Sequence, residues 1–315
     1  MKIAILDDYQ DVAKDMADWS GLLAQHEVTF FHDVYEGLDG FAERLQPFDV
    51  IGVMRERSPF QRDLLERLPN VKLLATAGMR NNAIDMEYCK ERGIAVCGTS
   101  NSAQATPELA WGLMLSLARN IHIEDARMRT GNWITTLGVD MQGKTLGVLG
   151  LGRLGQKMAQ IAQVFDMNVI AWSANLTTEG AAEHGVERVE KDELFARSDF
   201  LTIHYKLGER SRGLVTAREL GLMKKTAFLV NTSRGPIVDT DALIAALEAG
   251  TIAGAGVDVY DSEPLDPKAK IRNAPNSLLT PHLGYVTDGC YRAFYEQMVE
   301  SIEQWDAGTP VRVLA

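Results

Sequence analysis

Cysteine is scarce in this sequence: Cys89, Cys97 and Cys290 are the only three among 315 residues. An odd number without a close Cys-x-x-Cys pair fits neither a disulfide framework nor a zinc knuckle. We therefore expect buried or unreactive thiols, as in a reducing cytosol, and a cytoplasmic protein. No metal is expected either, because the histidines outside the motifs described below lack the spacing of metal ligands: His26, His32, His122 and His184.

Long hydrophobic runs are also absent. The longest apolar stretch, residues 109–118, is far shorter than the roughly 20 residues that cross a bilayer. The apolar start of the chain ends at Leu6, and Asp7 and Asp8 follow at once. We therefore expect neither a signal peptide nor contact with a membrane.

Positive charge is in short supply. Lys and Arg number 32 against 43 Asp and Glu, which gives a net charge of −11. A general nucleic-acid binder needs a basic face, so this class is disfavoured. The net charge does not exclude the binding of small anions, because that depends on local groups.

Apolar runs alternate with amphipathic stretches along the whole chain, and the length suggests about two domains of roughly 150 residues. Such alternation predicts parallel sheets with helices on both faces, and hence two doubly wound α/β domains. The expected strands are 2–6, 28–31, 50–54, 73–76 and 94–97 in a first series, and 145–149, 168–172, 200–204, 227–231, 254–259 and 277–280 in a second.

A predicted helix separates the two series. Thr106, Pro107 and Glu108 form a good helix start, because they supply a cap, a residue suited to the first turn and a favourable charge. Residues 109–118 are apolar nearly all round, so this helix is expected in a core or at a subunit contact, and the pattern does not separate the two. A last helix over 286–305 follows the final strand and could cover either domain.

A glycine motif opens the second series. Gly150, Gly152 and Gly155 follow the strand at 145–149 and precede a helical pattern at 156–165, the context that a dinucleotide-binding loop requires. The first glycine permits a tight turn, the second lets the backbone approach a pyrophosphate, and the third allows close helix packing. The helix N-terminus then offers N–H groups to phosphate.

The neighbouring residues define the rest of the expected cofactor contact. Arg153 and Leu154 lie within the loop, Arg153 either as a phosphate contact or as a solvated surface charge. The next strand ends at Ser173 and Asn175, without the acid that usually binds a ribose 2′-hydroxyl and without an arginine for a 2′-phosphate. Ser173 thus stands at the ribose position, and the choice between NAD and NADP is open.

Three polar segments each follow an apolar strand, where open α/β sheets place their ligands. The first reads Asn-Thr-Ser-Arg-Gly and contains Arg234. The second reads Asp-x-x-x-x-Glu-Pro and contains Glu263, and the third reads Pro-His and contains His282. Arginine offers a fork for a carboxylate. Histidine exchanges protons near neutral pH, and a neighbouring glutamate would orient its ring.

In this order, the glycine loop and the three segments resemble the D-isomer-specific 2-hydroxyacid dehydrogenase family, which includes phosphoglycerate, glycerate and D-lactate dehydrogenases. The resemblance covers nearly the whole chain, and the ordered set is specific where one motif alone is not. It implies an NAD- or NADP-dependent oxidoreductase that moves a hydride between nicotinamide and C2 of a small D-2-hydroxy or 2-keto acid. It also implies a homodimer.

The same resemblance implies the domain organisation. A Rossmann-type cofactor domain, residues 102–284, would be inserted into a flavodoxin-like substrate domain made of residues 1–101 and 285–315. The last helix would then return to the substrate domain. The homodimer would form largely through the cofactor domains, and the apolar helix at 109–118 is compatible with that.

Individual roles follow from the resemblance. Arg234 would bind the substrate carboxylate and polarise the keto oxygen, and His282, paired with Glu263, would be the acid in reduction and the base in oxidation. Each has a structural alternative: a surface ion pair for Arg234, a packed ring for His282 and a solvated acid for Glu263. The remaining implied contacts are, to the cofactor, Asp258, His204, Thr232 and Thr106, and, to the substrate, the backbone N–H groups of Ala77 and Gly78. Of these, His204 has a packed ring as its alternative, and Asp258 a solvated acid.

The chain departs from the common family pattern directly after Ala77 and Gly78. Met79 and Arg80 stand where many relatives have small or aromatic residues. Arg55 and Arg57 belong to an Arg-Glu-Arg-Ser stretch that resembles the Arg-Ser-Arg-Thr stretch of phosphoglycerate dehydrogenases, where arginine meets the substrate phosphate. Arg55, Arg57 and Arg80 would form a local anion site; alternatively, they pair with Glu56 and other acids.

Two other functions are compatible with this fold. One is a dinucleotide-sensing corepressor scaffold with little turnover, which an intact Arg-Glu-His set does not exclude. The other is a different chemistry on a related fold, such as formate oxidation or adenosylhomocysteine hydrolysis. The former needs another substrate pocket, and the latter needs lysine and cysteine motifs that the sequence does not show.

Overall fold

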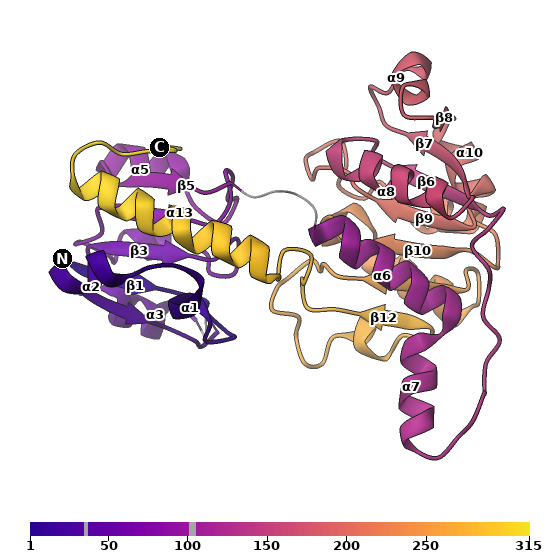
Figure 1. The fold of residues 1–315 in the computed structure, drawn as a ribbon, viewed down its shortest axis with the longest axis horizontal. Coiled ribbons are helices and arrows are strands. Elements are labelled where there is room, and N and C mark those ends of the chain that lie inside the picture. Colours follow the sequence, from indigo (N-terminus) through magenta and orange to yellow (C-terminus); the bar gives the residue numbers. More distant parts are fainter. Residues whose placement is uncertain (35–36, 101–104) are drawn as a thin grey trace. The chain divides into compact units, whose positions relative to one another are not determined.

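The computed structural model describes residues 1–34, 37–100 and 105–315. The chain divides into two compact units: Met1–Ser102 with Val286–Ala315, and Ala103–Tyr285 (Figure 1). Each unit contains one sheet whose strands are all parallel. The predicted pair of doubly wound α/β domains is confirmed.

The first unit has a five-stranded sheet in the order β2-β1-β3-β4-β5, the flavodoxin-like order. The strands are short apolar runs, buried except in β2 and at a few strand ends, as expected where helices cover both faces of a parallel sheet. The order reverses between β1 and β3, so their carboxyl ends form the switch point of this sheet. The strands are β1 (Lys2–Ile5), β2 (Glu27–Phe30), β3 (Val50–Val53), β4 (Leu73–Thr76) and β5 (Ala95–Gly98).

The last helix of the chain, α13 (Asp288–Asp306), belongs to this first unit, where it contacts α1, β4 and β5 (Figure 1). Thr287 caps it by accepting a hydrogen bond from the N–H of Cys290 at 3.3 Å. Of the two domains that this helix could have covered, it packs on the first unit. The other helices of the unit are α1 (Ala13–Met16), α2 (Ser20–Gln25), α3 (Leu38–Leu45), α4 (Arg62–Leu65) and α5 (Met86–Arg92).

The second unit has a seven-stranded sheet in the order β12-β11-β10-β9-β6-β7-β8, which contains the dinucleotide-binding strand order. Only β8 was not expected: it is two residues long and polar, so no apolar run announces it. The strands are β6 (Thr145–Leu149), β7 (Asn168–Trp172), β8 (Glu187–Arg188), β9 (Phe200–Ile203), β10 (Phe228–Asn231), β11 (Gly254–Val257) and β12 (Ser277–Leu279).

Helices cover both faces of this sheet. The side chains of α6 and α8 share a hydrophobic cluster on one face, and those of α10, α11 and α12 share a second cluster on the other. The helices are α6 (Ala105–Arg119), α7 (Ile121–Arg129), α8 (Arg153–Val164), α9 (Thr178–Ala182), α10 (Lys191–Arg197), α11 (Ala217–Leu222) and α12 (Thr240–Glu248), with 3-10 turns at Gly235–Ile237 and Lys270–Asn273.

The apolar helix predicted between the two series is α6. Ala110 and Met114 are fully buried, and α6 contacts β10 and β11 of its own unit. The apolar face of this helix is therefore core, not an exposed contact surface. Within the described ranges, no helix has both the length and the hydropathy that a bilayer span needs.

Candidate active site

The glycine loop between β6 and α8 is tight on one side and open on the other. Gly150 has φ +102°, and a Cβ atom there would lie 2.7 Å from the backbone oxygen of His204. A Cβ atom at Gly155 would lie 2.2 Å from the oxygen of Gly150, whereas one at Gly152 would meet no atom within 4 Å. The loop therefore requires glycine for its turn and its helix packing, and it leaves room for a ligand at Gly152.

Helix α8 begins directly after this opening. Its N-cap residue is Gly152, which has no side chain to bond the first N–H groups of the helix. Arg153 is exposed and Leu154 half-buried at its first two positions. Uncapped N–H groups at the positive end of a twelve-residue helix suit a pyrophosphate, so the loop fits the predicted dinucleotide.

The end of β7 borders the same loop. Ser173 Oγ accepts a hydrogen bond from the N–H of Leu151 at 3.2 Å, and the N–H of Ala174 donates to the hydroxyl of Tyr205 at 3.1 Å. The ring of Tyr205 is stacked on Trp172. Ser173 thus holds the glycine loop, and the strand end carries no charge.

His204 and Thr232 contribute buried polar atoms at neighbouring strand ends. Burial lowers the pKa of His204 to about 4, so the ring is neutral at pH 7. Its Nε2 lies 2.8 Å from Thr202 Oγ1. Among the described residues, His204 Nδ1 and Thr232 Oγ1 are buried and have no hydrogen-bond partner. A bound ligand at this edge would satisfy such atoms, which suits the predicted cofactor contacts.

The ring of His282 is held by Glu263. Its Nδ1 lies 2.5 Å from Glu263 Oε2, and the N–H of Tyr260 donates to Glu263 Oε1 at 2.8 Å. The backbone of His282 has φ +54°, and its N–H donates to the oxygen of Asp258 at 2.8 Å. Because Nδ1 is engaged, Nε2 is the ring nitrogen that can serve a reacting group.

Asp258 is a fully buried acid, not a solvated one. Its carboxylate accepts hydrogen bonds from Thr280 Oγ1 at 2.6 Å, from the N–H of Leu283 at 2.7 Å and from the N–H of Gly284 at 2.9 Å. Burial raises its pKa, and these bonds act in the opposite direction. Asp258 therefore fixes the loop that carries His282, and Thr106 joins it by donating to the oxygen of Gly284 at 2.7 Å.

The segment that carries Arg234 packs against the one that carries Glu263. A Cβ atom at Gly235 would lie 2.1 Å from the carbonyl carbon of Tyr260. Asn231 shapes the turn, because it accepts from the N–H of Ser233 and donates to the oxygen of Arg234, both at 3.0 Å. Tertiary structure thus places the turn that carries Arg234 against Tyr260, three residues before Glu263.

The first unit holds the predicted substrate residues. The N–H of Ala77 donates to the oxygen of Val53 at 2.9 Å, and the N–H of Gly78 donates to Thr99 Oγ1 at 2.8 Å. A Cβ atom at Gly78 would lie 2.1 Å from Arg55 Nη1. Both N–H groups therefore already have partners, and the guanidinium of Arg55 covers Gly78. Arg80 is exposed.

Arg57 lies inside a polar network of the same unit. Its guanidinium stands 4.4 Å from the centre of the Tyr9 ring and donates to the oxygen of Asp7 at 2.5 Å and to the hydroxyl of Tyr291 at 2.8 Å. Pairing with Glu56, the alternative given for the arginines, is seen for Arg55, whose Nε lies 3.6 Å from Glu56 Oε2.

Several residues of the site were not predicted. Thr280 holds Asp258, Tyr260 holds Glu263, and Thr99 occupies the N–H of Gly78. Thr280 stands directly before the Pro-His motif, which is the one signal that could have found it. The other two contacts join segments whose proximity depends on the folded sheet.

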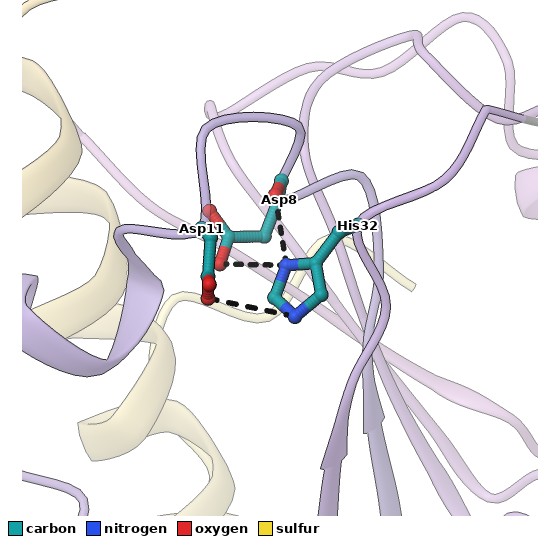
Figure 2. Close-up of side chains that lie close together, drawn as sticks. All are labelled: Asp8, Asp11 and His32. Carbon is teal, nitrogen blue, oxygen red and sulfur yellow. Dashed lines mark hydrogen bonds and ion pairs between the residues drawn. The ribbon is translucent and has the colours of Figure 1, made fainter.

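One group of described residues has the composition of a metal site: Asp8, Asp11 and His32 (Figure 2). His32 Nδ1 lies 3.4 Å from Asp8 Oδ2, whereas Nε2 lies 3.5 Å from Asp11 Oδ1. Both oxygens of Asp8 also accept backbone N–H groups, from Val12 and Ala13. The two ring nitrogens face different acids, so the ring bridges two carboxylates.

Comparison with known proteins identifies the family. Residues 111–284, more than half of the chain, match the model described as "D-isomer specific 2-hydroxyacid dehydrogenase, NAD binding domain". The chain belongs to the D-isomer-specific 2-hydroxyacid dehydrogenase family. It is therefore an oxidoreductase of 2-hydroxyacids that uses a nicotinamide dinucleotide, and the predicted family is confirmed.

Individual members of the family are similar over most of the chain. A glyoxylate reductase of Thermococcus litoralis is 38% identical over 251 residues, 76% of each protein. A hydroxypyruvate reductase of Blautia hydrogenotrophica is 28% identical and covers 100% of this chain and 99% of its own. The crystal structure of a phosphoglycerate oxidoreductase from Vibrio cholerae is 36% identical, with a TM-score of 0.93 and coverage of 98% and 99%.

Proposed function

We propose that this dehydrogenase interconverts a D-2-hydroxy acid and its 2-keto acid, with His282 as the proton donor and acceptor and Arg234 as the carboxylate anchor. The observation that carries this proposal is the 2.5 Å contact between His282 Nδ1 and Glu263 Oε2. The pair lies beside the buried carboxylate of Asp258, in the unit that also contains the open glycine loop. We assign cofactor binding, proton transfer and the carboxylate anchor to this unit, and the remaining substrate contacts to the other.

The proton chemistry falls to His282. In reduction, its Nε2 gives a proton to the keto oxygen, and in oxidation it takes the proton back from the hydroxyl. Glu263 holds Nδ1 and so keeps the ring in one orientation. When bound, a nicotinamide dinucleotide would supply or accept the hydride at C2 of the substrate.

Arg234 provides the charge that the substrate requires. A guanidinium can give two parallel N–H groups to a carboxylate, which orients the acid as well as binding it, and Nη1 of Arg234 donates to the oxygen of Ser233 at 2.7 Å within the protein. In the first unit we assign substrate contacts to Arg55, Ala77, Gly78 and Arg80. Since the N–H groups of Ala77 and Gly78 have partners within the protein, Arg55 is the stronger contributor there.

The ribose position supports the use of both dinucleotides. Ser173 is uncharged and already bonds to the glycine loop, and no acid follows it at the end of β7. Without a carboxylate, the 2′-phosphate of NADP meets no repulsion there. We therefore propose that the enzyme accepts NADP as well as NAD.

A homodimer is supported by an exposed apolar segment of the second unit. Trp133, Ile134 and Leu137 are 75%, 78% and 92% exposed. They follow α7, and a hollow of about 530 Å³ lies beside two of them, between Arg119 and Ile134. Apolar groups that are exposed together mark protein contacts, and we assign this surface to a second copy of the chain.

The test is a panel of 2-keto acids offered with NADH and with NADPH, compared between the natural enzyme and His282→Asn. Glyoxylate and hydroxypyruvate come first, because the relatives named above are reductases of these acids. We expect kcat to fall by about 10²–10⁴-fold in His282→Asn, the usual contribution of a general acid, with little change in dinucleotide binding.

The matched control is His184→Asn in the same unit, which should retain normal turnover, since His184 lies outside the motifs that build the site. Near-normal turnover in His282→Asn would contradict the assignment of the proton donor. Absence of turnover with every 2-keto acid in the natural enzyme would contradict the proposed reaction as a whole.

A further inference from the structure

The Glu263 and His282 pair joins two loops of the second unit that follow neighbouring strands. Glu263 comes after β11 and His282 after β12, and these strands pair in parallel. The two residues are 19 positions apart in the chain, so the local sequence does not fix their spacing. His282 also has φ +54°, a conformation that persists only where the surroundings hold it. The spacing of the pair therefore depends on contacts between the two loops.

Tyr260 makes contacts with both loops. Its backbone N–H donates to Glu263 Oε1 at 2.8 Å. Its hydroxyl lies 2.9 Å from the backbone oxygen of Thr280 and 3.1 Å from that of Val257, and it shares its one hydrogen between them. The oxygen of Thr280 also accepts the N–H of His282 at 3.1 Å. Tyr260 thus holds the carboxylate of Glu263 with its backbone and the turn before His282 with its side chain.

The hydroxyl of Tyr260 remains a hydrogen-bond donor at neutral pH. Burial raises the pKa of Tyr260 to about 12, and the negative charges of Asp258 and Glu263 act in the same direction. The ring is half-buried and packs against the hydrophobic cluster that contains Val257 and Ile271. Phenylalanine has the same ring, so Tyr260→Phe removes the hydroxyl bonds and keeps both the packing and the backbone N–H.

The loop of His282 is also held on its other side. The N–H groups of Leu283 and Gly284 donate to the carboxylate of Asp258. Neither of these two bonds involves Glu263, so they anchor the loop without setting its distance from that carboxylate. The hydroxyl of Tyr260 acts on the residues before His282 and belongs to the residue whose N–H holds Glu263. It is therefore the contact that relates the two members of the pair.

We propose that Tyr260 is a positioning residue for proton transfer, which acts through its hydroxyl by setting the spacing of Glu263 and His282. The proposal rests on the proposed function, because it takes His282 as the proton donor and acceptor. Without the hydroxyl, the turn before His282 is free to shift, and a displaced proton donor costs rate at the chemical step. Dinucleotide binding depends on the glycine loop and is left as it is.

The first experiment measures kcat, KM and NADH affinity of Tyr260→Phe with the 2-keto acid that the natural enzyme reduces best. We expect kcat to fall by about threefold to tenfold, the effect of one hydrogen bond, with KM and NADH affinity unchanged. The matched control is Tyr88→Phe, a half-buried tyrosine in α5 of the first unit, which should keep the natural kcat. An unchanged kcat in Tyr260→Phe, or a parallel loss of NADH affinity, would overturn the proposal.

A double-mutant cycle tests whether Tyr260 acts through His282. In the His282→Asn background, Tyr260→Phe should lower kcat no further, because the group that it positions is already gone. A merely structural role of the hydroxyl would reduce kcat by the same factor in both backgrounds. Such additivity would contradict the proposal.

Proton NMR separates this inference from the proposed reaction, because it needs no turnover. A carboxylate only accepts hydrogen bonds, so the hydrogen of the 2.5 Å contact with Glu263 belongs to Nδ1 of His282. A hydrogen in so short a bond resonates far downfield, and its loss in His282→Asn assigns the signal. We expect the signal to broaden or disappear in Tyr260→Phe, because a looser loop exposes it to exchange with water, and to persist in Tyr88→Phe.

The outcomes of this measurement are distinct. A signal as sharp in Tyr260→Phe as in the natural protein, or no signal in the natural protein, would refute the positioning role. Absence of turnover with every 2-keto acid, together with the expected change of the signal in Tyr260→Phe, would refute only the reaction.

Discussion

Left-handed backbone at residues other than glycine marks three positions of this chain that carry its polar chemistry. Asp7, Arg55 and His282 have φ values between +54° and +64°. Each such residue costs on the order of 1 kcal/mol unless its surroundings hold it. His282 is held through its N–H and its ring, and Arg55 through its oxygen, which accepts from Asn81 Nδ2 at 2.6 Å. The conformations of Arg55 and His282 therefore depend on contacts that no local sequence pattern predicts.

Asp7 makes stability depend on pH. Its pKa is raised from 3.8 to about 6 in the folded chain, so the folded state holds a proton that the unfolded state releases between these values. Stability from this group is fully present below about pH 4 and is lost as pH rises through 6. Asp7→Asn should therefore stabilise the first unit at pH 7 to 8, by up to about 3 kcal/mol.

The measurement is urea unfolding of both proteins between pH 5 and 8. The gain from Asp7→Asn should grow up to about pH 6 and then level off. Asp15→Asn, an exposed acid in the same unit, is the matched control and should change stability little at any pH. A destabilised Asp7→Asn at pH 8 would show that the ionised carboxylate is bound more strongly than its burial costs.

At the scale of elements, the contact between β6 and α8 depends on one glycine. A methyl group at Gly155 would lie 2.2 Å from the backbone oxygen of Gly150 and 2.9 Å from Val148 Cγ1. Gly155→Ala should push helix and strand apart, cost about 1–3 kcal/mol of stability as overpacking does, and weaken dinucleotide binding.

The matched control is Gly221→Ala in α11, where a Cβ atom would meet nothing within 4 Å. This control should be neutral or slightly stabilising, because alanine favours a helix more than glycine does. Urea unfolding and titration with NADH measure both effects. Unchanged dinucleotide affinity in Gly155→Ala would contradict the role of this close contact.

The elements themselves were largely predictable. The strands of both sheets lie within one or two residues of the apolar runs, because a buried parallel strand needs apolar side chains on both faces. The strand β8 was not predicted, because Glu187 and Arg188 pair with β7 without forming an apolar run. For α6 the pattern predicted a helix but not its neighbours, because a helix that is apolar all round fits a core and a subunit contact equally.

At the scale of the whole molecule, the surface that we propose for a second copy lies after α7. Replacing Trp133 and Leu137, which are 75% and 92% exposed, by aspartate should leave the fold intact and convert a dimer into a monomer of 34.7 kDa. Sedimentation velocity measures this change. The control is Leu23→Asp, an exposed leucine of the first unit, which should stay dimeric. A monomeric natural protein would contradict the proposed assembly.

The sequence by itself determined the two parallel α/β folds, the family and the kinds of residue that the site contains, because apolar periodicity and glycine spacing are local. Tertiary structure decided which of them meet. Glu263 and His282 come together over 19 residues, and Arg57 and Tyr291 over 234. It also decided that Arg57 donates to the backbone oxygen of Asp7 and to the hydroxyl of Tyr291 within its own unit, since such contacts are properties of packed neighbours and not of a motif.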